Sequence, residues 1–275
     1  MASLNIWQLF EFALLLVLAG GIAGFLAGLF GIGGGTVLVP AFFQVFQSVG
    51  IDEAVRMQLA VGCSLALVIV SSWRSIGTHR KKGAVDEALL RSWWLPLPMG
   101  AIMASVAVAY VSGDVLKGVF AAVCALIAFK MLFGKDNWRF GSEIPGNPVR
   151  GIVGVSVGFV STLMGIGGGM LNNTFMTAYG RPIHQAVATS AGVGMFVAIP
   201  GMLGYIWAGW DKAGLPPFST GYVNWIAVAL ILPVTLLVTP YGVRLAHALP
   251  RRQLELALGV YLLIIASRFG WAMLF

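Results

Sequence analysis

Two glycine runs lie inside long apolar segments of this chain, and the second copies the first. Residues 31–35 read Gly-Ile-Gly-Gly-Gly, and residues 165–169 repeat them. Glycine costs about 1 kcal/mol relative to alanine in a helix interior, so three in a row interrupt a helix. In hydrocarbon such a break is tolerated only where it is buried in protein or lines a wet cavity. Paired breaks at corresponding places in two halves point to the binding site of a transporter.

The composition around these runs indicates a protein embedded in the lipid bilayer. Of its 275 residues, 59% are hydrophobic and only 10% are charged, whereas soluble domains carry about 25% charged residues. Apolar runs of about 20 residues, long enough to cross the bilayer, recur along the whole chain. The sequence therefore predicts an all-α polytopic membrane protein. The net charge of +7 would suggest nucleic acid in a soluble protein. Here it reflects basic cytoplasmic loops, and no nucleic-acid partner is expected.

The likeness between the halves extends beyond the glycine runs. Ala-Val-Gly-Cys-Ser at 60–64 matches Ala-Val-Ala-Thr-Ser at 186–190, so Cys63 occupies the place of Thr189. This pattern predicts a duplicated unit, with an N-terminal repeat at 1–133 and a C-terminal repeat at 150–275. The most polar stretch, 134–149, is interpreted as a cytoplasmic linker between them.

The distribution of cations distinguishes parallel from inverted repeats. If each broken segment crosses the membrane once, the repeats are parallel and the cations divide rather evenly between the two faces. If each returns to the side it left, as a hairpin, the repeats are inverted and only Arg56, Lys117 and Lys212 leave the basic face, Arg268 being set aside. The second arrangement fits the positive-inside rule far better. We therefore predict two inverted repeats, each a glycine-broken helical hairpin plus three transmembrane helices, with both termini outside.

A helix that starts after a glycine break presents free N–H groups and the positive end of its dipole. Such an end binds an anion without a buried lysine. The candidate substrate-binding residues are the glycines of both runs and nearby neutral donors: Gly33, Gly34, Gly35, Thr36, Ser64, Gly167, Gly168, Gly169, Asn172, Asn173, Thr189 and Ser190.

Structural explanations of the same residues stay open. The glycines could serve only close helix packing, and Asn172 and Asn173 could cap the broken helix. The hydroxyls of Ser64, Thr189 and Ser190 could bond to carbonyls of their own helices.

Other function classes lack their motifs. The sequence has no Gly-Lys-Ser/Thr phosphate loop and no Cys/His cluster with metal spacing, so neither ATP drive nor a cofactor is expected. Acidic residues are nearly absent from the apolar segments, which disfavours a buried carboxylate coupling site. A membrane enzyme would need a His/Asp/Glu cluster, but His79, His184 and His247 have no paired carboxylates in sequence. The chain is therefore predicted not to be an enzyme.

The doubled glycine run, with Thr36 and Val39-Pro40 after its first copy and 186–190 after its second, resembles the TauE/SafE family of sulfite and organosulfonate permeases. The likeness covers essentially the whole chain, although Cys63 stands where a threonine is common and Met170 follows the second run. The resemblance implies transport of a small sulfur-containing anion across a bacterial inner membrane. We expect a secondary permease, with export favoured for a sulfite-type substrate. An anion channel of the same architecture is the alternative, and homo-oligomerisation stays open.

Overall fold

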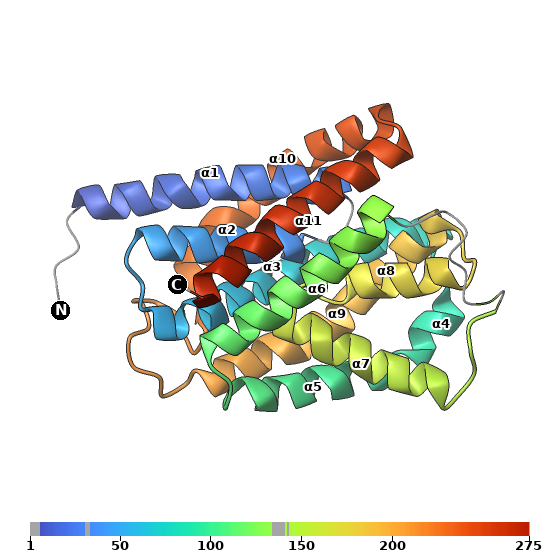
Figure 1. Ribbon diagram of the computed structural model, residues 1–275, viewed down its shortest axis with the longest axis horizontal. Coiled ribbons are helices and arrows are strands. Elements are labelled where there is room, and N and C mark those ends of the chain that lie inside the picture. Colours follow the sequence, from blue (N-terminus) through green and yellow to red (C-terminus); the bar gives the residue numbers. More distant parts are fainter. Residues whose placement is uncertain (1–5, 31–33, 134–140, 142, 275) are drawn as a thin grey trace.

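The computed structural model describes residues 6–30, 34–133, 141 and 143–274, and helices make up most of them (Figure 1). The N-terminal half contains α1 (Ile6–Phe30), α2 (Gly35–Ser48), α3 (Glu53–Lys81), α4 (Glu87–Ser92), α5 (Pro96–Val108) and α6 (Gly113–Phe133). The C-terminal half contains α7 (Val149–Met164), α8 (Gly169–Ala178), α9 (Ile183–Ala208), β1 (Ser219–Thr220), β2 (Val223–Asn224), α10 (Trp225–Ala248) and α11 (Arg251–Leu274).

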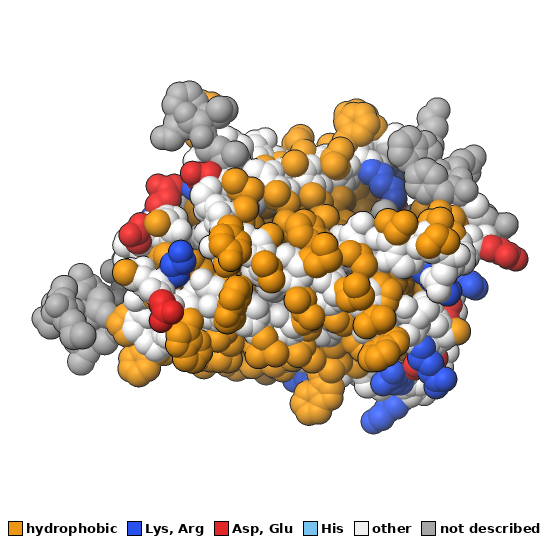
Figure 2. Space-filling model, turned by 90° about the horizontal axis from the view of Figure 1, so that it is seen from below, with side chains coloured by type: hydrophobic (Ala, Val, Ile, Leu, Met, Phe, Trp, Pro, Cys, Tyr) orange, Lys and Arg blue, Asp and Glu red, His pale blue; other side chains and the backbone are white. Residues whose placement is uncertain are grey.

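Five helices of the described chain, α3, α6, α9, α10 and α11, are long and apolar enough to cross a membrane. Apolar side chains cover the middle of the face shown in Figure 2, and most of the charged side chains gather toward its two ends. This separation is what a hydrocarbon layer requires, because charged groups must reach water or a headgroup. The prediction of an all-α polytopic membrane protein is confirmed.

Each glycine run separates a long helix from a shorter one that turns back. In Figure 1, α1 and α2 run in opposite directions, and so do α7 and α8; α7 also runs opposite to α1. Helix α7 ends at Gly165, whose left-handed backbone (φ 68°) allows the N–H of Ile166 to reach the carbonyl of Ser161 at 3.1 Å. This is a standard glycine-dependent helix end. Helix α8 starts after Gly168, which also has a positive φ (77°).

Helix pairing follows the duplication. Helix α1 packs along α10, and its counterpart α7 packs along α5, the helix that corresponds to α10. Helices α3 and α9 pair with each other, as do α6 and α11. Exchanging the two halves therefore reproduces these main helix pairings.

Glycines permit the closest of these pairings. A Cβ at Gly24 in α1 would lie 2.8 Å from the Cα of Thr235 in α10, and one at Gly28 would overlap the carbonyl oxygen of Thr239. Between α5 and α7, a Cβ at Gly158 would overlap the carbonyl of Leu97. Small residues thus let the backbones touch, as at other membrane helix interfaces.

Two connections differ from simple spans. Helix α5 has only 13 residues, fewer than the roughly 20 that a crossing requires. It starts at Pro96, a residue that suits the first turn of a helix because its missing N–H is unpaired there anyway. The six-residue α4 precedes it as a separate element. Before α10 the chain forms a small antiparallel hairpin, with Ser219 paired to Asn224.

Candidate functional site

The two glycine runs meet in the interior of the molecule. Gly35, the first residue of α2, lies against Gly165 and Ile166, so closely that a Cβ on Gly35 would overlap the Gly165 carbonyl oxygen and the Ile166 Cα. Ser64 of α3 donates a hydrogen bond from its Oγ to the same Gly165 carbonyl at 2.8 Å. The start of α2, the end of α7 and the middle of α3 therefore share one point. Gly33 and its two predecessors lie outside the described residues.

Among the described residues, both short helices start with backbone donors that have no backbone partner. In α8 the first N–H to reach a backbone carbonyl is that of Asn172, which donates to Gly168 at 3.0 Å. In α2 it is that of Val37, which donates to Gly34 at 3.0 Å. Neither helix has a side-chain cap at its N-terminus. Within the described part of the chain, the preceding amides thus stay free to bind an acceptor, and the helix dipole favours a negative one.

Buried hydroxyls without partners accompany these amides. Thr36, Ser161 and Thr162 are all fully buried, and none of their hydroxyl oxygens has a hydrogen-bond partner among the described residues. Ser161 Oγ lies 3.7 Å from the position that a Cβ on Gly168 would take. A buried polar group left unpaired costs about 1–3 kcal/mol, so these groups call for a bound solute or water. The sequence pattern identifies Thr36 but not Ser161 and Thr162, which precede the second glycine run. The signal that could have identified them is a pair of hydroxyl residues just before that run.

The amide of Asn172 ties α8 to α9. Its Nδ2 donates to the Oγ of Ser190 at 2.8 Å, and its side chain is almost fully buried. It does not cap α8, because the N-cap residue of that helix is Gly168. The neighbouring Asn173 has a buried Oδ1 with no partner in the described chain. Neither asparagine therefore shows the capping contact that was the structural alternative.

Position 189 and its counterpart 63 each bind a helix-capping residue of the opposite half of the chain. The Oγ1 of Thr189 accepts a hydrogen bond at 2.9 Å from the backbone N–H of Asp86, which caps α4 through Leu89. The sulfur of Cys63 accepts one at 3.2 Å from the N–H of Asn224, which caps α10. The structure thus places Cys63 and Thr189 in equivalent positions, as their sequence match predicts. Among the described residues, neither the Thr189 hydroxyl nor the Cys63 thiol has a hydrogen bond to a glycine run.

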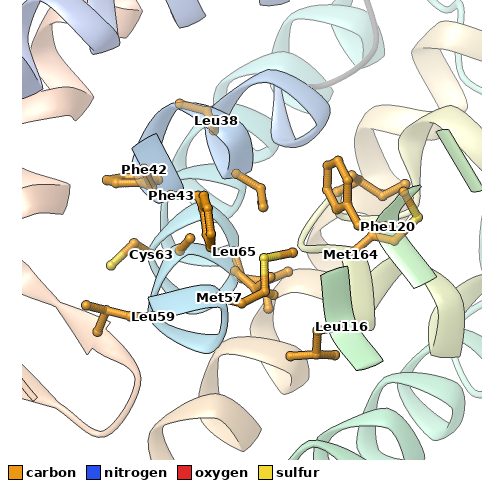
Figure 3. Packing of buried hydrophobic residues seen from close by; sticks show 14 of the residues in the cluster. Leu38, Phe42, Phe43, Met57, Leu59, Cys63, Leu65, Leu116, Phe120 and Met164 are labelled. Carbon is orange, nitrogen blue, oxygen red and sulfur yellow. The ribbon is translucent and has the colours of Figure 1, made fainter. Parts of the chain in front are cut away.

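Aliphatic side chains pack against the second run. Val61 of α3 lies against Gly165, Val68 of the same helix against Gly167, and Val193 and Val197 of α9 against Gly168. Figure 3 shows the adjoining core, where side chains of α2, α3, α6 and α7 converge, among them Leu65, Phe120 and Met164. Aliphatic side chains therefore lie against the second run, and such a low-dielectric environment strengthens electrostatic interactions.

Comparison with known proteins identifies the family. The family model described as "Sulfite exporter TauE/SafE" matches residues 16–269. A "probable membrane transporter protein" of Haemophilus influenzae is 32% identical over 94% of this chain and 98% of its own length. Similarly described proteins of Methanocaldococcus jannaschii and Bacillus subtilis are 29% and 22% identical, covering 93% and 96% of their own lengths. No solved structure matches.

These similarities span nearly the full chain and agree with the membrane-crossing helices. They describe a multi-pass membrane transporter rather than an enzyme. The chain therefore belongs to the TauE/SafE sulfite exporter family of membrane transporters.

Proposed function

We propose that this transporter is a secondary permease for a small sulfur-containing anion, such as sulfite or an organosulfonate, and that it exports its substrate across the bacterial inner membrane. One observation carries the proposal: among the described residues, α2 and α8 start with amides that have no backbone partner, and Gly35 at the start of α2 contacts Gly165 of the second run. The positive dipole end at each helix start favours an anionic solute. The family description supports a sulfur oxyanion.

The proposed site consists of backbone amides from Gly33–Gly35 and Gly167–Gly169 and of neutral side chains. Ser64, Asn172 and Ser190 lie at or next to the runs, and Thr36 and Asn173 follow them; we add Ser161 and Thr162 because their buried hydroxyls lack partners among the described residues. Thr189 stays a candidate because it is next in sequence to Ser190, which binds Asn172. Neutral donors suit a carrier, since a buried cation would hold the anion too tightly to release it.

The proposed topology is a pair of inverted repeats, 1–133 and 150–275, joined by a cytoplasmic linker at 134–149. The opposite directions of the two hairpins along the long axis support it (Figure 1), as does the exchange of helix pairs between the halves. Oppositely oriented copies place both helix starts at mid-depth, where alternating access to one site becomes possible. The aliphatic packing on Gly167 and Gly168 favours such a gated carrier over an open channel.

The buried hydroxyls offer a direct test. We expect Ser161→Ala and Thr36→Val each to weaken anion binding about tenfold, because each removes a hydrogen-bond donor to a charged ligand. Purified protein would be screened by thermal shift against sulfite, sulfate, thiosulfate, taurine and sulfoacetate, and the best anion then followed by counterflow in proteoliposomes. Ser267→Ala, at an exposed position of α11, is the control and should bind like the parent. Unchanged affinity in both test variants, or stabilisation by none of the anions, would contradict the proposal.

A further inference from the structure

We propose that residues 83–93, which include α4 and are here called the α4 segment, form a gate between the basic end of the molecule and the second glycine run. The inference concerns regulation of the site and rests on the proposed function only for what passes the gate. In Figure 1, α4 lies at the end of the molecule opposite to the C-terminus. Arg80, Lys81, Lys82 and Arg91 flank or belong to the segment.

Apolar side chains of the α4 segment close the space between this end and the glycine run. Leu89, Leu90 and Trp93 are buried in a cluster of their own, together with Val193 and Val197 of α9 and with residues of α3, α7 and α8. Val193 and Val197 are the side chains that lie against Gly168. A single apolar layer therefore reaches from α4 to the proposed anion site. A hydrated anion cannot pass through it without displacing the segment.

Close contacts within this layer show how the segment is seated. A Cβ at Gly192 in α9 would lie 2.7 Å from the δ-carbons of Leu90, so Leu90 fills the space that this glycine leaves. The ring of Trp93 meets that of Phe175 in α8 edge-on, with centroids 5.7 Å apart. The segment thus rests on α8 and α9, the two helices that carry Asn172 and Ser190.

Polar contacts hold the segment on two sides. Glu87 accepts two hydrogen bonds from the guanidinium of Arg80 in α3, at 2.8 and 3.1 Å, and Asp86 faces α9 and the turn before it. The N–H of Asp86 donates to Thr189 at 2.9 Å, and the Asp86 carboxylate lies 4.0 Å from the guanidinium of Arg181 in the turn between α8 and α9. Together these residues are called the Asp86 latch. The segment starts at Gly83, whose positive φ of 62° suits a glycine, and ends before Pro96. It is therefore a short segment bounded by a glycine and a proline, two residues at which regular helix is interrupted.

The C-terminal half contains an equivalent capping residue that is uncharged. Asn224 occupies the place of Asp86: each caps the following helix through its side chain and donates its N–H to position 63 or 189. Where Asp86 faces Arg181, Asn224 donates from its own amide to the carbonyl of Pro217 and to Ser219 in the hairpin. Asp86 and Asn224 are thus equivalent in their capping and backbone contacts but differ in charge. Of these two residues, only Asp86, at the basic end, faces a cation.

Accessibility of a buried reporter tests the gate without any substrate. In a background of Cys63→Ser and Cys124→Ala, Val193→Cys would be labelled with a membrane-impermeant maleimide in inverted and in right-side-out vesicles. We expect Thr189→Val to raise labelling in inverted vesicles about fivefold, the effect of losing one hydrogen bond on an opening equilibrium. Asp86→Asn, which keeps the cap but loses the attraction to Arg181, should raise it less.

The control is Arg91→Gln, which changes the charge at an exposed position of α4 and should leave labelling unchanged. Met176→Cys serves as a second reporter if Val193→Cys does not fold. Unchanged labelling in Thr189→Val, or an equal rise from both sides of the membrane, would overturn the gate.

A cross-link tests what the gate controls. Leu90→Cys with Gly192→Cys should form a disulfide across the contact between α4 and α9, abolish transport, and recover it on reduction. Full transport by the cross-linked protein would also overturn the gate. If labelling responds as expected but no sulfur anion is transported by the uncross-linked protein, the gate stands and the proposed substrate falls.

Discussion

Lys117 of α6 is a fully buried cation, although both of its carboxylate partners are exposed. Its Nζ lies 2.7 Å from Glu53 and 3.0 Å from Asp114, and 5.8 Å from the centroid of the Phe43 ring. The sequence assigns this lysine to the less basic face. Its burial is a packing feature that no local pattern reveals. The charge is compensated at the surface and is not available to the glycine runs.

The way this lysine is paired leads to a prediction with a definite order of stabilities. Neutralising both carboxylates, in Glu53→Gln with Asp114→Asn, should lower the free energy of unfolding by about 3 kcal/mol, because an unpaired charge stays buried. Adding Lys117→Met should recover most of that loss, because the buried charge disappears. Chemical denaturation in micelles measures both values. A double variant as stable as the parent would show that the lysine finds water instead.

Buried side chains also mark how far the sequence could predict the site. Ser64 and Asn172 were identified from their distance to the glycine runs, and each lies at or beside one. Ser161 and Thr162 come before their run, where the pattern of donors that follow a helix break does not point. The bond between Thr189 and Asp86 joins residues far apart in the chain, and no propensity or spacing encodes such a contact.

At the scale of elements, glycine has two separate uses. Along α1 it lets α10 approach, as at Gly24 and Gly28. In the second run it supplies positive φ values, 64° at Gly167 and 77° at Gly168. Gly35 combines a helix start with backbone contact to the other run. The packing explanation therefore holds for the α1 glycines, and the binding role of the two runs stays a prediction.

Two glycines of the runs give a matched pair of variants. A Cβ on Gly35 would overlap backbone atoms, which cannot give way, whereas the atoms nearest to a Cβ on Gly169 lie 3.8 Å away. We expect Gly35→Ala to lower the free energy of unfolding by about 1–3 kcal/mol and to abolish transport. Gly169→Ala should preserve both. Thermal unfolding and counterflow in proteoliposomes would check this, and parental transport by Gly35→Ala would refute the close contact.

The helical hairpins themselves could be predicted, because glycine breaks and apolar length are local signals. The α4 segment and the β1–β2 hairpin could not. Both are short, and both are fixed mainly by contacts with α9 and α3. Their own sequences carry only capping residues, Asp86 and Asn224, and proline at the start of α5.

At the scale of the whole molecule, the two ends differ. The α4 segment and the turn between α10 and α11 lie at one end of the long axis, and α1 starts and α11 ends at the other (Figure 1). The distribution of cations predicts a cytoplasmic face at the end with the α4 segment, and this stays a prediction. Which helix faces touch depends on glycine positions spread over both halves.

Site-directed labelling would decide the topology. We expect Lys82→Cys and Ala248→Cys to react with an impermeant reagent from the cytoplasmic side, and Lys212→Cys to react from the opposite side. All three positions are exposed. The reason is the positive-inside rule applied to hairpins that return to their own side. Labelling of Lys82→Cys and Ala248→Cys from different sides would exclude inverted repeats.

The touching of Gly35 and Gly165 has a consequence for the history of the chain. The sequence predicts that the two halves are copies of one unit. In such a chain each copy forms part of the wall around the other, so a bulkier residue at this contact in one run would disturb the other run. The sequences of the two halves could then diverge independently at lipid-facing positions, whereas changes at the contact between Gly35 and Gly165 would have to match each other. This contact is called the seam. A hybrid joining halves from two distant relatives should fail first at this seam.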